Sequence, residues 1–325
     1  MHTKILYSVF LFLCLHKLLI SFKNSGLFFT KHGLFSTKHG LFSIPNWAKL
    51  KSHTEQRSIT MQQQQCKSND QCVIFSKKND CICEPDLTKN EFLRGKKLIT
   101  ISPGGFKGFY LLGILTYIKQ HYDLENYIFS GASAGSWNSL FMCYKGDPIE
   151  FVYKLVDHKI KNTKSIPELE YFLKYKLLTS WKDDDFDLQR LFIGITTFRK
   201  FKPHIDIFSD FENLEDAING CMASSHIPFI TGGFTNKYHN ILSFDGGFSS
   251  YPYLNTDNLV LHVSPSMWQN ISEEKKENTN IKQKIRSLKE FTELFSVSKN
   301  NLMELFDDGY QDAKQRKTYL DSIFT

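Results

Sequence analysis

The stretch YIFSGASAGSW (residues 127–137) places Ser133 between Gly131 and Gly135. The apolar residues before it predict a buried strand over 127–130, and SAGSWNSLFMCYK after it has the spacing of a helix. A serine at such a strand-to-helix turn adopts a strained backbone that lifts its hydroxyl above the sheet. The stretch therefore predicts a nucleophile elbow, with a small-residue turn of no chemical role as the alternative.

The segments around this turn predict the fold class. KKLITIS contains a short β-branched strand over 98–102, and apolar residues at helical spacing follow over 109–122. Strand, helix, strand, helix in this order predicts an α/β fold with a mainly parallel central sheet flanked by helices. Further elements are expected downstream: helices over 149–178 and 214–224, strands over 190–198, 241–244 and NLVLHVSP, and helices in LKEFTELF and LMELFDDGYQDAKQRKTYLDSIF.

Composition excludes some classes of function. The chain has 325 residues, of which 41% are hydrophobic and 23% charged, so it can bury a substantial core. A net charge of +6 is compatible with an anionic membrane surface. It is too small and too scattered to indicate nucleic-acid binding, and the chain has neither an aromatic-basic RNA motif nor zinc-finger spacing.

The chain divides into three parts by sequence character. Residues 1–25 contain the apolar run ILYSVFLFLCL, which indicates a signal peptide or signal-anchor, with a peripheral membrane segment or an inconsequential extension as alternatives. Residues 26–95 hold a GLFFTKH/GLFSTKH repeat, a glutamine run and a cysteine cluster, and 96–325 form the predicted catalytic domain. Membrane association is expected, with secretory or organelle targeting if the N-terminal run acts as a signal and a peripheral cytoplasmic location otherwise.

Four cysteines cluster before the predicted domain. They are Cys66, Cys72, Cys81 and Cys83. Their spacing lacks the paired C-x2-C of common zinc sites, although it allows two disulfides in a secretory compartment. Free thiols, disulfides and a zinc site remain as alternatives.

A glycine-rich loop, SPGGFKGF, follows the first predicted strand. Its closely spaced glycines leave backbone N–H groups clustered and accessible, as an oxyanion hole needs. It matches neither G-x-G-x-x-G nor a G-K-[ST] phosphate loop. The predicted oxyanion-hole residues are Gly104, Gly105, Phe106, Lys107 and Gly108.

Asp245, followed by Gly246 and Gly247, stands at the end of a predicted strand. A carboxylate at the carboxyl edge of a sheet can point into a cleft. The alternative is an ordinary Asp-Gly turn.

Together these three turns resemble the patatin-like phospholipase family. Its pattern is a glycine-rich oxyanion loop with a basic residue, then G-x-S-x-G, then D-G-[GA], which read here PGGFKG, GASAG and DGG. CMASSHIPF and LFDDGYQDA also resemble family segments, and the resemblance covers roughly residues 96–325. Pro103 departs from the pattern, because it replaces a glycine and removes one N–H donor.

The resemblance implies a three-layer patatin-like fold and a lipid acyl hydrolase of phospholipase A type. It implies that Ser133 is the nucleophile and Asp245 the proton acceptor, with an acyl-enzyme intermediate and no metal or cofactor. The expected partner is a phospholipid or other acyl lipid at a membrane or lipid surface, and the head group stays open.

Two other functions remain as alternatives. An α/β-hydrolase would need a Ser133/Asp/His triad, for which His262 is the only histidine after Asp245, in an awkward position within a strand. His226 and His239 are interpreted as structural or surface residues. The other alternative is a catalytically weak lipid-binding member of the family.

Overall fold

The structure is a computed structural model that describes residues 71–77, 80–83, 90–163, 165–199, 202–249, 251–268 and 301–325. The predicted signal segment, the GLF repeat, Cys66 and the LKEFTELF helix lie outside these residues.

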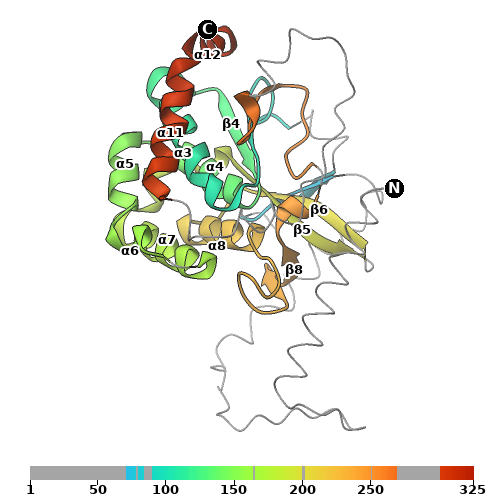
Figure 1. The fold of residues 1–325 in the computed structure, drawn as a ribbon. Coiled ribbons are helices and arrows are strands. Elements are labelled where there is room, and N and C mark those ends of the chain that lie inside the picture. Colours follow the sequence, from blue (N-terminus) through green and yellow to red (C-terminus); the bar gives the residue numbers. More distant parts are fainter. Residues whose placement is uncertain are drawn as a thin grey trace, which may run out of the picture. The chain divides into compact units, whose positions relative to one another are not determined.

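The described strands form one sheet (Figure 1). Its order is β2-β1-β6-β5-β4-β3-β9, and β8 pairs with both β5 and β7. The run β5-β4-β3-β9 is parallel, whereas β6 and β8 lie antiparallel to β5. The strands are β1 (Cys72–Phe75), β2 (Asp80–Cys83), β3 (Lys97–Ile101), β4 (Tyr127–Gly131), β5 (Leu191–Arg199), β6 (Lys202–Ser209), β7 (Asn236–Tyr238), β8 (Ile241–Phe244) and β9 (Leu259–Val263).

Helices pack on one face of this sheet around the larger core, and a smaller core covers the other face. The helices are α3 (Gly108–His121), α4 (Ala134–Met142), α5 (Pro148–Leu155), α6 (His158–Lys161), α7 (Ile166–Ser180), α8 (Leu214–Ser224), α11 (Leu302–Gln315) and α12 (Lys317–Phe324). Side-chain caps fix where two of them begin. Ser165 accepts from the Glu168 N–H at the start of α7, and Asn213 accepts from the Asp216 N–H at the start of α8. The predicted α/β fold with a mainly parallel central sheet is confirmed.

Helix α11, the last but one in the chain, packs directly on α3 (Figure 1). A Cβ atom at Gly113 would lie 2.0 Å from the Phe306 carbonyl oxygen, and one at Gly309 would lie 2.0 Å from the Tyr110 carbonyl oxygen. Only glycine at both positions allows the two backbones to approach this closely. The Tyr110 hydroxyl also donates to Asp312 Oδ2 at 2.5 Å, so the GYQDA segment joins the C-terminal end of the chain to α3.

The cysteine cluster contributes strands to the sheet, which its sequence did not predict. β1 pairs parallel with β6, and β2 pairs antiparallel with β1. Cys72 is disulfide-bonded, so it is not a free thiol. The predicted boundary at residue 96 falls after these two strands.

Candidate active site

Ser133 sits at the sharp turn between β4 and α4. Its backbone angles are φ 53° and ψ −128°, outside the regions that non-glycine residues usually occupy. A Cβ atom at Gly131 would lie 2.2 Å from the Gly135 carbonyl oxygen, and one at Gly135 would lie 2.1 Å from the Ile101 carbonyl oxygen. Both glycines are therefore required for this turn to pack against β3.

Ser224, at the end of α8, holds the turn in place. The Ser133 N–H donates to Ser224 Oγ at 2.8 Å, and Ser224 Oγ donates to the Gly194 carbonyl oxygen at 2.7 Å. Both serines are buried. This positioning role was not predicted from the sequence, although the CMASSHIPF segment that contains Ser224 carried the signal.

Asp245 follows β8 and faces the elbow. Its N–H donates to the His226 carbonyl oxygen at 2.7 Å, and its Oδ1 accepts from the Gly247 N–H at 2.7 Å. The Ser133 hydroxyl lies beside its carboxylate and favours the ionised form. Burial raises the pKa of Asp245 to about 6, although the hydrogen bonds from Ser133 and Gly247 favour the ionised form.

The glycine-rich loop lies against both motifs. Gly105 has a φ of +53°, and a single 3₁₀ turn, Gly105–Lys107, follows. The Lys107 N–H donates to the Gly104 carbonyl oxygen at 3.0 Å, and the Gly108 N–H also donates within the loop. Among the described residues, no hydrogen bond takes up the N–H groups of Gly104, Gly105 or Phe106. These three are therefore the N–H groups of the loop that remain available to a substrate oxygen.

Close contacts between glycines and their neighbours bring the three motifs together. A Cβ atom at Gly246 would lie 2.7 Å from Ala132 Cβ, and one at Gly247 would lie 3.1 Å from Pro103 Cβ. The D-G-G turn therefore lies between the elbow and the glycine-rich loop and packs against both. Pro103, the departure from the family pattern, lies at this junction.

An apolar cavity opens at Ser133. Gly105, Phe106 and Gly108 line it near the serine, and side chains from α3, α4, α5 and α7 line the rest. These include Leu112, Trp137, Leu140, Phe141, Phe151, Leu155, Leu169, Leu173 and Leu177. Its lining suits a hydrocarbon chain, because almost every side chain that it offers is apolar.

Glu170 is the only acidic or basic side chain among the described residues that line this cavity. It lies on α7 and is 6% exposed. Burial and the nearby Asp245 charge together raise its pKa to about 8, although an interaction with Ser225 favours the ionised form. Its position within the apolar stripe of Ile166, Leu169, Leu173 and Leu177 was a sequence signal that the prediction missed.

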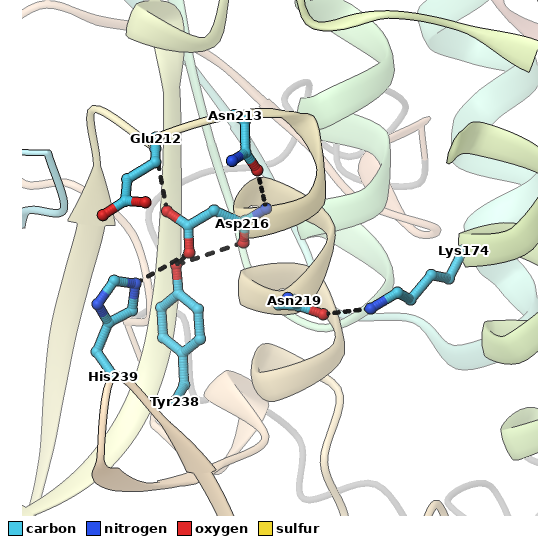
Figure 2. A network of polar contacts seen from close by, with 7 residues as sticks. All are labelled: Lys174, Glu212, Asn213, Asp216, Asn219, Tyr238 and His239. Atoms are coloured by element: carbon cyan, nitrogen blue, oxygen red, sulfur yellow. Dashed lines mark hydrogen bonds and ion pairs between the residues drawn. The ribbon is translucent and has the colours of Figure 1, made fainter. Parts of the chain in front are cut away.

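The histidines occupy different settings. His262 lies in the middle of β9, and its Nδ1 hydrogen-bonds Thr100 Oγ1 at 2.8 Å. His239 Nε2 pairs with Asp216 Oδ1 at 2.9 Å (Figure 2). His226 is 6% exposed, and its carbonyl accepts from the Asp245 N–H. No described contact joins any of these rings to Ser133.

Within the parts of the chain that the structure describes, no group of histidine, cysteine or acidic side chains could hold a metal ion. The same residues include no helix with the length and hydropathy of a membrane span.

Residues 99–254 match the family model of patatin-like phospholipases. This segment is a patatin-like phospholipase domain. It contains the glycine-rich loop, Ser133 and Asp245, so the family match and the converging motifs concern the same residues.

Comparisons with curated proteins and with solved structures add no support to the family match. No curated protein matches the chain. Among solved structures, VipD from Legionella pneumophila is 12% identical with a TM-score of 0.38, over 79% of this chain and 71% of VipD. A chain of the ExoU–SpcU complex from the Pseudomonas aeruginosa type III secretion system is 11% identical with a TM-score of 0.32, over 70% of this chain and 52% of that one. At such low TM-scores neither likeness carries weight, and the identification of the patatin-like domain rests on the family model.

Proposed function

We propose that the patatin-like domain hydrolyses fatty-acyl esters of lipids through a dyad of Ser133 and Asp245. The observation that carries this proposal is the position of the Ser133 hydroxyl, which interacts with the buried Asp245 carboxylate and lines an apolar cavity. With a pKa of about 6, Asp245 is mostly ionised at pH 7 and is a stronger base than an ordinary aspartate.

In the first half-reaction, Asp245 accepts the hydroxyl proton as Ser133 Oγ attacks the ester carbonyl carbon. The developing oxyanion receives hydrogen bonds from the glycine-rich loop, for which the Gly104, Gly105 and Phe106 N–H groups are available. The C–O bond then breaks, and the alcohol leaves with the proton held by Asp245. In the second half-reaction water attacks the acyl-enzyme, Asp245 accepts its proton, and the fatty acid is released as Ser133 regains a proton.

The setting of His262 favours the dyad over the triad. A triad requires a histidine that hydrogen-bonds the serine. His262 instead pairs with Thr100 in the neighbouring strand, where the register places the two residues opposite each other. Asp245, whose carboxylate interacts with the Ser133 hydroxyl, is the proposed base.

A lipid surface is the proposed place of action. Phe229, Ile230 and Phe234 are exposed large apolar side chains. They lie on the same segment as Ile227 and Thr231, which line the apolar cavity at Ser133. An apolar segment beside the cavity mouth would partition into a lipid interface and bring the site to its substrate.

The test is fatty-acid release from a panel of phospholipids, lysophospholipids, galactolipids and triglycerides. We expect release by the wild-type protein, background release by Ser133→Ala and Asp245→Asn, and near-normal release by His262→Ala. A large loss in His262→Ala would favour the triad, and the absence of serine-dependent release from every ester would leave only a lipid-binding role.

A further inference from the structure

A second cavity adjoins the apolar cavity, because Glu170 and Thr231 line both. The rest of its lining is mainly polar and comes from α8, from β7 and from the residues between and just after them, including Asp216, Asn219, His226, Lys237 and His239. We call it the polar cavity.

The most acidic wall of the polar cavity is already occupied by internal contacts (Figure 2). Asp216 accepts from the Tyr238 hydroxyl at 3.0 Å, from His239 Nε2 at 2.9 Å and from the Glu212 N–H at 3.1 Å. Asn219 accepts from Lys174 Nζ at 2.8 Å. This network fixes β7 against α8, and it leaves Asp216 little capacity to bind a ligand.

Two other polar atoms in the polar cavity have no such partners. Glu170 Oε1 and His226 Nε2 are buried, and among the described residues neither has a hydrogen-bond partner. Both side chains belong to residues that are 6% exposed. A buried polar atom without a partner is destabilising, so two of them in one cavity point to a ligand that supplies the missing hydrogen bonds.

The protonation states of these two groups define the chemistry of that ligand. Burial and the charge of Asp245 raise the pKa of Glu170 to about 8, so at pH 7 its carboxyl is mostly neutral and carries an O–H donor. Burial lowers the pKa of His226, while its ring hydrogen-bonds the Phe234 carbonyl. The lowered pKa favours the neutral imidazole, one nitrogen of which carries a lone pair, and Nε2 has no partner among the described residues.

An uncharged donor and an uncharged acceptor in one cavity match the hydroxyl groups of a polyol. We propose that the polar cavity binds the hydroxyl-bearing alcohol part of the ester substrate, with the Glu170 carboxyl donating a hydrogen bond to a substrate hydroxyl and His226 Nε2 accepting one. The proposal rests on the proposed function, since the acyl chain would fill the apolar cavity while the alcohol passes Glu170 and Thr231. Glycerol and sugar esters are the substrate class that it favours.

The test compares two esters of the same acid, 1-decanoylglycerol and ethyl decanoate, in the same mixed micelles. Ethyl 10-hydroxydecanoate, which carries its hydroxyl on the acyl chain, is the third substrate. The variants are Glu170→Met, of similar size but without polar atoms, and Glu170→Gln, which keeps an uncharged N–H donor. Glu125→Gln, an exposed glutamate before β4 and thus at the strand end opposite Ser133, is the matched control.

We expect wild type, Glu170→Gln and Glu125→Gln to prefer the glycerol ester. Glu170→Met should lower kcat/KM for that ester by about three- to tenfold, the effect of one neutral hydrogen bond, and leave the ethyl ester nearly unchanged. As the pH rises above about 8, the wild-type preference should fall, because ionised Glu170 can no longer donate, whereas that of Glu170→Gln should persist. The other titratable groups near Glu170 are the same in the Gln variant: Asp245, Asp216, His226, Lys237 and His239.

Three results would overturn the proposal. They are an equal loss on both esters in Glu170→Met, an unchanged ratio in that variant, and a Glu170-dependent preference for the hydroxyl on the acyl chain. The proposed function fails separately, since it requires that Ser133→Ala lose hydrolysis of ethyl decanoate, which carries no free hydroxyl.

Discussion

Replacing Asp245 with asparagine should stabilise the fold while abolishing activity. Asp245 is 4% exposed, and burial raises its pKa from 3.8 to about 6. Because a tenfold change in an ionisation equilibrium is about 1.4 kcal/mol, this rise corresponds to about 3 kcal/mol. The raised pKa means that the protonated form is favoured by folding. The contribution of this group to the free energy of unfolding is fully present below pH 3.8 and is lost as the pH rises through about 6.

At neutral pH the native protein therefore carries a destabilising buried carboxylate. Asparagine has the same shape and no charge, and its oxygen can still accept from the Gly247 N–H. We expect Asp245→Asn to raise the free energy of unfolding by about 1–3 kcal/mol at pH 8 and by almost nothing at pH 4. Loss of the base should lower kcat by about 10²- to 10⁴-fold.

The assay is urea unfolding at several pH values between 4 and 8, followed by circular dichroism, alongside fatty-acid release. Asp307→Asn, at an exposed position on α11, is the control for loss of a negative charge. Two results would refute the assignment of Asp245 as a buried, ionised carboxylate that destabilises the native state. One is a lower free energy of unfolding for Asp245→Asn than for the wild type at pH 8, and the other is an increase that does not depend on pH.

Three further predictions follow from the same geometry. In wild type, kcat/KM should be about tenfold lower at pH 5 than at its plateau above pH 7, because protonated Asp245 cannot accept the serine proton; a flat profile between pH 5 and 7 would argue against this base. Ser224→Ala leaves the Ser133 N–H without its acceptor, so kcat should fall and the free energy of unfolding should drop by about 1–3 kcal/mol, measured by urea unfolding; unchanged kcat would remove Ser224 as a positioning residue. Phe229→Ser with Phe234→Ser should lower hydrolysis of vesicle lipids several-fold and spare a soluble short-chain ester, with Tyr153→Ser, another exposed aromatic, as control; equal losses on both substrates would show that the segment does not act at the lipid surface.

The elbow and the D-G-G turn were predictable from sequence because their constraints are local. Gly131 and Gly135 are required by contacts a few ångströms away, and Ser133 adopts the strained angles that a strand-to-helix elbow imposes. The helix over Leu214–Ser224 and the strand over Ile241–Phe244 also have the predicted bounds, since each has a clear hydrophobic pattern and flanking turn residues.

Elements that depend on distant partners were missed. β6 contains Pro203 and the buried Asp206, both unfavourable in a strand. The structure offsets the second cost, because the Thr197 hydroxyl of β5 donates to Asp206 Oδ2 at 2.5 Å. β1 similarly gains its partner, β6, from a segment more than a hundred residues away.

The residues of the site likewise differ in whether local sequence or tertiary packing determines their role. Glu170 and Ser224 reach Ser133 and its cavities through tertiary packing of α7 and α8, so the sequence signals at these two positions did not reveal their roles. The oxyanion loop was predicted as five residues, and the hydrogen bonds within it leave three N–H groups available. Which N–H groups a loop uses internally depends on its backbone angles, which the sequence does not reveal.

The most direct test of the proposed Ser133–Asp245 dyad is to trap the acyl-enzyme and locate the acyl group. The protein is mixed with a slowly deacylated p-nitrophenyl ester, quenched in acid, digested and analysed by mass spectrometry. We expect one acyl group on Ser133 in the wild type and in His262→Ala, little acylation in Asp245→Asn and none in Ser133→Ala. Acylation of another residue, or acylation of Ser133 that requires His262 and not Asp245, would contradict it.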